Sequence, residues 1–369
     1  MAKTYRVGVI GRTGKGDYGH GIDTVWKAIP RAQVVAVADE NEKGRATAAK
    51  NTGAANSYAD YREMLAREKL DVVAVGPRWV DCHHEMILAC AEHSCHIFME
   101  KPFCRTLAEA DDMVRALEMR HLKLAIAHQT RWSPVLDRAK SLIAQGEIGE
   151  VLEVRGRGKE DARGGAEDLW VLGSHVMDML RALFGDATSC DAEVTVGGRR
   201  VAKKDVAQGN EGIGPLAGDA VRAVYTFDKG VIGHFASRRN KAGSPSRFGV
   251  QIFGTKGVIE LGTGYMNPGQ ILLDSSWSPG RSGAKWQKLT SAGIDKPTPP
   301  GSPGNEGGNV AAVNDLLDGI EQDRQPRCSA YEARGTIEMI AAVFESHRQR
   351  GPVPIPMKNR MNPLTMLVE

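Results

Sequence analysis

Hydrophobic residues in the first third of the chain form short runs that are separated by amphipathic segments. Short apolar runs bounded by glycine, proline or charged residues are typical of buried strands. They fall at residues 6–11, 33–38, 71–75, 97–99 and 122–127. Segments with helical spacing lie between or beside them, at residues 22–29, 58–68, 85–92 and 107–118. Strands that alternate with helices in this way predict a parallel sheet with right-handed crossovers.

The pattern changes after Gly185 to short strands of alternating polar and apolar residues. Residues 221–227 and 231–236 flank an Asp-Lys-Gly turn and predict a β-hairpin, and residues 251–261 predict another. Such strands build an antiparallel or mixed sheet with one uncovered face. Residues 279–308 are rich in Gly, Pro and Ser, so we expect a long loop there. Helical patterns end the chain, at residues 310–321 and 330–348.

The length of 369 residues suits two domains, each large enough for its own core. The change in pattern favours an α/β domain with a parallel sheet at residues 1–128. It favours an α+β domain with a large open mixed or antiparallel sheet at residues 129–369. The C-terminal segment, from about residue 330 to 369, is a candidate to pack back on the first domain.

Composition excludes several classes of function. The 41% hydrophobic and 25% charged residues are typical of a soluble globular protein, and a net charge of +3 without a basic, aromatic-rich block does not indicate nucleic-acid binding. No apolar run approaches the roughly 18 residues that span a membrane. The first six residues lead directly into a strand and leave no room for a signal peptide, so we expect a cytoplasmic protein. The six scattered cysteines predict reduced, mostly buried thiols and offer no metal-binding cluster.

A glycine-rich stretch follows the first strand. Gly11 ends the strand, and Gly14, Gly16 and Gly19 have the Gly-x-Gly-x-x-Gly spacing of loops whose backbone approaches a pyrophosphate. Asp39 ends the next strand, twenty residues beyond Gly19, where such folds place an acid on the adenosine ribose. This carboxylate and the adjacent glutamate would repel a 2′-phosphate, so we expect NAD rather than NADP. A helix or turn cap is the alternative interpretation of Asp39.

The strand at residues 97–99 ends in Glu100-Lys101-Pro102. Proline supplies no ladder N–H group and favours an extended residue before it. Lys101 is therefore expected at the carboxyl edge of the sheet, where open α/β sheets bind their ligands. An ordinary lysine at a surface strand end is the alternative.

Candidate acid–base residues cluster at residues 163–180. If this segment is one helix, Asp168, Val171, His175 and Asp178 are spaced by three and four residues and share one face. A histidine between carboxylates can be oriented and tuned for proton transfer near neutral pH. The alternative for His175 is a core histidine whose ring nitrogens are satisfied by hydrogen bonds.

The Glu-Lys-Pro triplet and the Gly-x-His-x-x-Asp pattern at residues 173–178 together resemble the Gfo/Idh/MocA family of NAD(P)-dependent sugar and polyol oxidoreductases. The turns at residues 146–152 and 254–257 are similar to family segments as well. The resemblance implies an N-terminal Rossmann fold. It also implies hydride transfer between nicotinamide and a CH–OH carbon of a sugar, polyol or derivative. Family members usually cover the open sheet face by oligomerising, so the resemblance implies a homodimer or homotetramer.

The resemblance also implies roles for individual residues. Lys101 and His175 form the implied catalytic pair, one as base and the other stabilising the alkoxide, with Asp168 and Asp178 beside them. Expected cofactor contacts are Gly11, Arg12, Thr13, Gly14, Gly16, Gly19, Asp39, Pro77, His83, Glu100, Lys101 and Arg131. For His83 the alternative is a solvated helix start, and for Arg131 it is a helix cap.

Val171 departs from the family pattern Asp-x-Gly-x-His-x-x-Asp, in which it stands at the first Asp. Valine can neither orient an imidazole nor relay a proton, so Asp168 or Asp178 is expected to compensate. Two rival functions stay open. One is a glycoside-cleaving enzyme that recycles hydride on a bound NAD, and the other is a non-catalytic dinucleotide or sugar sensor, which Val171 favours.

Overall fold

The computed structural model describes residues 3–368, which form two compact units. The first unit runs to Ala127 and includes two later segments, Asn210–Gly214 and Asn309–Ile337. The second unit contains His128–Gly209, Pro215–Gly308 and the described chain from Glu338 onward. This division begins its second unit one residue before the predicted boundary at residue 129.

A six-stranded parallel sheet, in the order β3-β2-β1-β4-β5-β6, forms the centre of the first unit. Of its two central strands, β4 is buried along its whole length and β1 at every residue except Arg6, as expected for a parallel sheet covered on both faces. The strand order reverses between β1 and β4, and ligands bind at the carboxyl ends of the strands at such a switch point. The strands are β1 (Tyr5–Ile10), β2 (Ala32–Ala38), β3 (Asn56–Tyr58), β4 (Val72–Val75), β5 (His96–Met99) and β6 (Leu124–Ile126).

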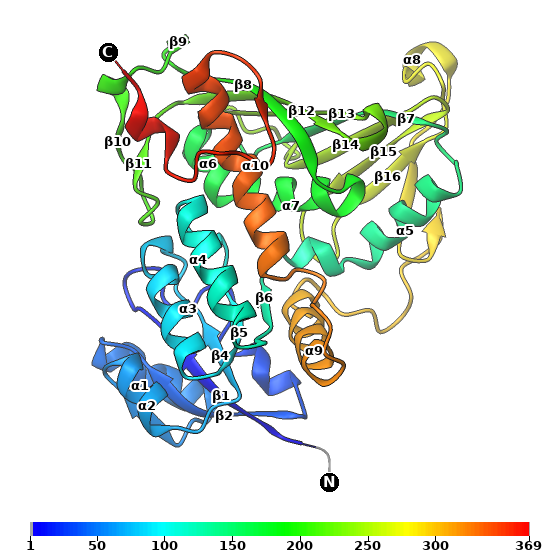
Figure 1. Ribbon diagram of the computed structural model, residues 1–369. Helices are drawn as coiled ribbons and strands as arrows, with labels where there is room; N and C mark the ends of the chain where they lie inside the picture. Colours follow the sequence, from blue (N-terminus) through cyan, green and yellow to red (C-terminus); the bar gives the residue numbers. More distant parts are fainter. Residues whose placement is uncertain (1–2, 369) are drawn as a thin grey trace. The chain divides into compact units, whose positions relative to one another are not determined.

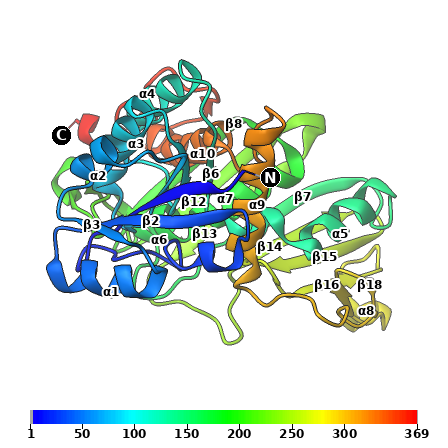
Figure 2. The same ribbon diagram turned by 90° about the horizontal axis from the view of Figure 1, so that it is seen from below.

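Helices cover both faces of this sheet, with α1 on one side and α3 and α4 on the other (Figure 2). The helix expected at residues 107–118 is confirmed as α4, whose cap residue Thr106 accepts a hydrogen bond from the backbone N–H of Glu109. The helices are α1 (Glu42–Thr52), α2 (Tyr61–Arg67), α3 (His83–Glu92), α4 (Leu107–Glu118) and most of α9 (Gly307–Glu321).

The helix expected at residues 22–29 is wrong. Only one 3₁₀ turn forms there, at Val25–Ala28. Gly21, with a φ of +78°, and Pro30 bound the segment, which is therefore too short to sustain an α-helix. The glycine-rich stretch thus continues as an irregular loop up to this turn.

His96, at the start of β5, gives the first unit a pH-dependent stability. Its Nδ1 accepts a hydrogen bond of 2.9 Å from the backbone N–H of Lys123, and burial together with the charges of Lys3 and Lys123 lowers the pKa of His96 to about 4. Between pH 4 and the ordinary value of 6.5, the unfolded chain therefore binds more protons than the folded chain. Stability is fully present above pH 6.5 and falls as the pH falls towards 4.

We expect the wild type to lose up to about 3 kcal/mol of unfolding free energy across this window. The H96N variant keeps an acceptor in the place of Nδ1 but does not titrate, so its unfolding free energy should change much less. Urea unfolding at a series of pH values measures both. H93N, at an exposed histidine of the same unit, is the matched control and should follow the wild type. Equal pH slopes for H96N and the wild type would contradict the assignment.

An eleven-stranded mixed sheet forms the second unit, in the order β18-β17-β16-β15-β14-β7-β13-β12-β8-β19, with β9 paired to β8. Only β13 and β7 pair in parallel among its described strands. The strands are β7 (Val151–Arg157), β8 (Ala187–Val196), β9 (Arg199–Arg200), β12 (Ala220–Phe227), β13 (Ile232–Arg238), β14 (Gly249–Gly254), β15 (Gly257–Gly262), β16 (Gly269–Leu272), β17 (Gln287–Thr290), β18 (Gly293–Ile294) and β19 (Val353–Pro354). The predicted hairpins are confirmed as β12–β13 and β14–β15.

Helices cover one face of this sheet, where Figure 1 shows α5 and α7. Gly156 of β7 leaves room there for Val176 of α7, and the Tyr225 hydroxyl on β12 donates a 3.0 Å hydrogen bond to the carbonyl of Met339 on α10. The helices are α5 (Pro134–Ala144), α6 (Ala166–Val171), α7 (Gly173–Phe184) and α10 (Ala330–Gln349), which begins in the first unit.

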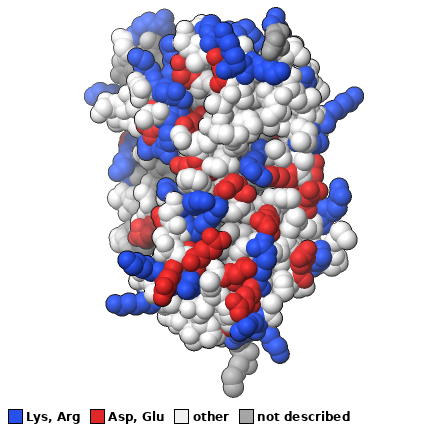
Figure 3. All heavy atoms as spheres, turned by 90° about the vertical axis from the view of Figure 1, so that its left-hand side faces the viewer, with Lys and Arg blue, Asp and Glu red and all other residues white. Residues whose placement is uncertain are grey.

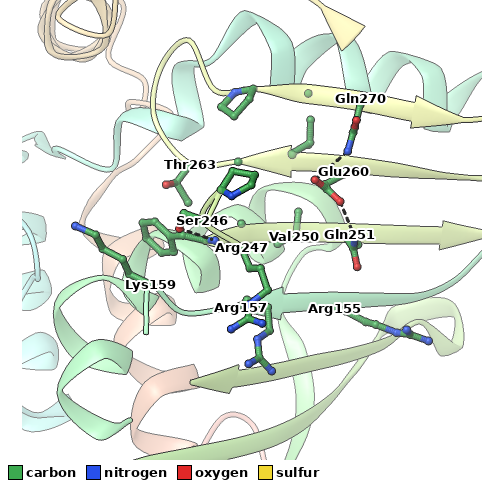
Figure 4. Close-up of a pocket in the computed structure, with 17 residues that line it drawn as sticks. Arg155, Arg157, Lys159, Ser246, Arg247, Val250, Gln251, Glu260, Thr263 and Gln270 are labelled. Atoms are coloured by element: carbon green, nitrogen blue, oxygen red, sulfur yellow. Dashed lines mark hydrogen bonds between the residues drawn. The ribbon is translucent and has the colours of Figure 1, made fainter. Parts of the chain in front are cut away.

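The opposite face of the sheet carries polar side chains. In Figure 4, Gln251, Glu260 and Gln270 form a ladder across β14, β15 and β16. Glu260 accepts hydrogen bonds of 2.6 Å and 3.1 Å from the two glutamine amides. A hollow of 740 Å³ lies on this face, bordered by Arg155 and Arg157 on β7 (Figure 4).

The loop expected at residues 279–308 is only partly correct. It is interrupted by the single helical turn α8 (Pro279–Ser282) and by β17 and β18, which extend the sheet. Leu289 and Thr290 are buried in β17 and give this segment its own packing. The remaining residues, from 295 to 306, carry no strand or helix.

The surface and the cysteines fit the composition. All six cysteines are buried and remain thiols, as predicted. Acidic and basic side chains are interspersed over the face that Figure 3 shows. Within residues 3–368, no helix combines the length and the apolar character required to cross a bilayer.

Candidate active site

The glycine loop packs tightly against the carboxyl edge of the first sheet. It leaves β1 through a hydrogen bond from the Gly11 N–H to the carbonyl of Ala38 (2.9 Å). Gly16 and Gly19 both have positive φ, +89° and +65°. A side chain on Gly16 would collide with the backbone nitrogen of Arg78, and one on Gly19 would lie 2.5 Å from the Glu100 carboxylate. Glycine is therefore required at both positions to bring this backbone onto the sheet edge.

Glu100 holds the loop in place. Its buried carboxylate accepts a 2.9 Å hydrogen bond from the backbone N–H of His20 and a 3.2 Å contact from the His20 ring, while its other oxygen accepts from the N–H of Lys101 (3.1 Å). Burial alone would raise the pKa of Glu100, but the bonds to His20 and the charge of Lys101 outweigh it, so the pKa lies below its usual range. These contacts make Glu100 a residue that positions the loop. The predicted cofactor contact of Glu100 stays a prediction.

Lys101 lies where the sequence places it, directly after β5 at the carboxyl edge of the sheet. The residue is only 6% exposed, which is rare for a lysine. Burial holds a cationic side chain in one place and strengthens its field on anything that develops negative charge nearby.

His83 cross-links the two turns that flank this edge. Its Nδ1 lies 2.8 Å from the carbonyl oxygen of Pro102, and its Nε2 lies 2.7 Å from that of Pro77. The ring is fully buried, so the alternative of a solvated histidine is wrong. His83 and Pro77 contact each other, and His83 also contacts the turn at Pro102, while their predicted cofactor contacts stay predictions.

Asp39 ends β2 and is already engaged by the glycine loop. Its carboxylate accepts hydrogen bonds from the Thr13 hydroxyl (2.6 Å), the Thr13 N–H (3.1 Å) and the Asn41 N–H (2.9 Å). A carboxylate offers about four acceptor sites, so one further donor can bind. The residue before Thr13, Arg12, pairs with Asp81 at 2.9 Å and fixes the same part of the loop.

The residues present fit the adenosine end of NAD. A hollow of 460 Å³ is bordered by Thr13, Asn41 and Lys43, and the first two of these donate to the buried Asp39. Gly14, with a φ of +83°, has nothing within 4 Å of the place where a side chain would be, so its backbone is accessible. These features supply a ribose acceptor at the β2 edge, space beside it and a bare glycine backbone for phosphate.

In the second unit, the expected single helix is wrong. The chain forms α6 and α7 with a break at Leu172, whose φ of −116° lies outside the helical range. Gly173 follows the break and packs against the Phe235 ring, where a side chain would crowd it. His175 and Asp178 therefore share α7, whereas Asp168 and Val171 belong to α6.

Asp178 is fully buried and forms the base of a charged cluster. Both of its carboxylate oxygens accept from Arg131 Nε (3.0 and 3.1 Å), and Arg131 Nη2 adds a bond of 2.8 Å. His128 Nδ1 lies 3.7 Å from the same carboxylate, and the His128 ring contacts the His175 ring at 5.3 Å between centroids. Burial would raise the pKa of Asp178, but Arg131 and His128 outweigh it and lower the pKa. The cluster contacts His175 through the ring of His128.

The side chain of Asp168 bonds to Ser237 and to the backbone of Glu160. Its Oδ2 accepts from the Ser237 hydroxyl on β13 and from the Glu160 N–H (3.1 Å), while Oδ1 is buried without a hydrogen-bond partner among the described residues. Burial outweighs these bonds and raises the pKa of Asp168. The contacts of Asp168 thus tie α6 to the sheet, and its predicted role beside His175 stays a prediction.

The sequence reasoning missed four residues that organise these sites: His20, His128, Glu160 and Ser237. His128 carried a usable signal, since it is the second residue after β6 and so lies near a carboxyl strand end. Glu160 carried none, because neither its type nor its neighbours indicate a buried carboxylate.

Two protein-family models match the chain. Residues 5–128 match the oxidoreductase family with an NAD-binding Rossmann fold, and residues 140–355 match the C-terminal α/β domain of the same family. Levoglucosan dehydrogenase of Pseudarthrobacter phenanthrenivorans is 29% identical over 63% of this chain and 65% of its own length. D-apiose dehydrogenase of Paraburkholderia graminis is 27% identical over 65% of this chain and 64% of its own length. The chain therefore spans just under two thirds of the length of these relatives.

A solved structure of levoglucosan dehydrogenase with NADH and L-sorbose superposes with a TM-score of 0.76. It is 22% identical and covers 96% of this chain and 100% of its own, which shows a common fold. The two family matches and this fold agree with the Glu-Lys-Pro and Gly-x-His-x-x-Asp patterns, and the chain belongs to the Gfo/Idh/MocA family of oxidoreductases.

Proposed function

We propose that this protein is an NAD-dependent oxidoreductase that transfers hydride between nicotinamide and a CH–OH carbon of a sugar, polyol or derivative. The observation that carries the proposal is a buried Lys101 at the carboxyl edge of a parallel sheet, beside a glycine loop that is locked to that edge by Glu100. Relatives named for levoglucosan, D-apiose and myo-inositol supply the substrate class.

In the proposed mechanism, His175 accepts the proton of the substrate hydroxyl and Lys101 stabilises the alkoxide that develops. NAD, when bound, supplies the hydride acceptor. Asp178 and Arg131 fix His128, which in turn fixes the imidazole of His175. Val171 provides no acid at the family position, so this buried cluster takes over the orientation of the imidazole.

The proposed cofactor site uses the backbone at Gly11, Gly14 and Gly16 for the pyrophosphate and Asp39 for the adenosine ribose. Thr13 donates to Oδ2 of Asp39, so a bound ribose would share this carboxylate with Thr13. The neighbouring Glu40 is exposed and adds a negative charge against a 2′-phosphate.

Titration of the cofactor-free protein with NADH and, separately, NADPH tests the proposal. We expect saturable binding that favours NADH at least tenfold, about 1.4 kcal/mol. D39A should erase this preference, because the ribose acceptor is lost. Equal binding of NADPH would show that Lys43, which borders the same hollow, outweighs the two carboxylates. Turnover of levoglucosan, D-apiose or myo-inositol, followed as nicotinamide absorbance, then tests the substrate class; binding of neither cofactor would refute the enzyme assignment.

We further propose that the protein forms a homodimer or homotetramer through the polar face of the large sheet. Val224 on β12 is 39% exposed and lies between the buried Ala223 and Tyr225, so its side chain belongs to that face. Paired charges such as Arg222 with Glu193 (2.6 Å) alternate along β12 and β8 and can exchange partners across a two-fold axis. A monomer mass in sedimentation at micromolar concentration would contradict this.

A further inference from the structure

The connection between β13 and β14, residues 239–248, brings an aromatic ring to His175. The Phe248 ring lies 6.4 Å from the His175 ring, centroid to centroid, at an interplanar angle of 80°. The backbone N–H of Phe248 donates to the Ser246 hydroxyl (3.2 Å), which fixes the last turn of the connection (Figure 4). Phe248 is half-buried, so part of the ring is available to a ligand.

Glu160 holds both ends of this connection. Its Oε1 accepts from the backbone N–H of Arg238 (3.0 Å), and its carbonyl accepts from the N–H of Lys241 (2.9 Å). Its Oε2 accepts from Arg247 Nη2 at 2.9 Å, directly beside Phe248 in the chain. Arg157 of β7 completes the carboxylate at 2.6 Å (Figure 4 shows both arginines).

Glu160 is an unlikely residue for a purely structural turn. It is 1% exposed and has a φ of +61°, which is a strained backbone conformation for a residue other than glycine. A buried carboxylate with three charge-assisted or backbone donors is strongly directional, so it fixes the loop more closely than apolar packing would. Such strain persists where the surroundings fix a functional geometry.

We propose that Phe248 is a specificity-determining residue that forms an apolar wall beside His175, and that the Glu160–Arg247 ion pair positions it. A cyclic sugar or polyol presents C–H groups on one ring face, and an aromatic ring buries such a face while leaving the hydroxyl groups to polar partners. The ligand class is therefore a ring-form sugar or cyclic polyol rather than a short acyclic one. This assignment rests on the proposed function in that it takes His175 as a residue of the substrate site.

The positioning step is tested first, without activity. The ring current of Phe248 displaces the Cε1–H resonance of His175, which the H175Q variant identifies in a histidine ¹H–¹³C spectrum. F248L should move this resonance, and R247M should move it in the same direction while leaving the other histidine signals in place. Arg247 is 52% exposed, and Glu160 keeps Arg157 and the Arg238 N–H in R247M, so the fold should be retained. A wild-type resonance position in R247M would overturn the positioning role.

The specificity step is tested by a double-mutant cycle. We expect F248A to raise KM for a cyclic substrate such as myo-inositol about tenfold, with kcat and NADH affinity nearly unchanged. R247M should raise KM in the wild-type background but have no effect in the F248A background, because it acts only through the ring. R199M, at a 53% exposed arginine on β9 of the same sheet, is the matched control and should leave KM unchanged. Additive effects of R247M and F248A would overturn the proposal.

The experiments distinguish a failure of the proposed oxidoreductase function from a failure of the Phe248 proposal. If the wild type turns over no sugar or polyol while R247M and F248L still move the His175 resonance together, the proposed function fails and the Glu160–Arg247 positioning stands. If turnover is present and F248A raises KM equally for glycerol and for myo-inositol, the oxidoreductase assignment stands and the ring-face specificity is refuted.

Discussion

Replacing Lys101 by methionine should lower kcat about 10³-fold, about 4 kcal/mol, while the NADH dissociation constant stays within twofold. Lys101 is 6% exposed, and methionine fills nearly the same volume as the lysine stem, so the strand end should keep its packing. What is lost is the cationic Nζ, which the mechanism requires at the alkoxide. Single-turnover kinetics and a fluorescence titration with NADH measure the two quantities.

K123M is the matched control for this variant. Lys123 is a second buried lysine of the same unit, 8% exposed, and pairs with Asp323 at 2.8 Å. Its loss should cost stability but leave kcat unchanged. An unchanged kcat in K101M would refute the role of Lys101, whereas equal losses in both variants would indicate a general loss of folded protein.

The fold could be predicted to the extent that local patterns decide it. Residues 107–118 form α4 to the residue, because a Thr cap, an acidic first turn and a clear apolar stripe agree. The β12–β13 hairpin follows equally from alternation around the turn at Asp228–Gly230. Where tertiary contacts decide, the prediction failed. The break at Leu172 depends on how Gly173 meets Phe235, which lies 62 residues further along the chain.

The residues of the candidate site likewise divide into those that local sequence places and those that tertiary packing places. Lys101 could be placed from its strand and its proline, since both are local. The partners of His83 could not, because its ring bonds to carbonyls at Pro77 and Pro102 and both contacts arise from the packing of two turns. Asp168 illustrates the limit of helical spacing. Its distance from His175 in the sequence would put both residues on one face of a continuous helix, but the helix breaks between them and Asp168 bonds to Ser237 instead.

Replacing His175 by glutamine should lower kcat/KM for alcohol oxidation between about 10² and 10⁴-fold and remove the acidic limb of its pH profile. In the wild type the base must be unprotonated to accept the hydroxyl proton, so kcat/KM rises with pH through the pKa of the base. Glutamine can hold a hydrogen bond in the same place but cannot take up the proton. H234Q, on β13 of the same unit, removes a histidine that lies 3.8 Å from Glu153 and should leave the profile intact.

The pH profile also decides between the two possible assignments of base and electrostatic partner. If H175Q loses the acidic limb, His175 is the base and Lys101 acts through its charge alone. If kcat/KM falls but the limb survives, Lys101 is the base and His175 is the electrostatic partner. A profile and a rate that both match the wild type would remove His175 from the reaction. A wild type that binds NADH but turns over no sugar or polyol would instead favour the sensor alternative, to which Val171 at the family's acid position points.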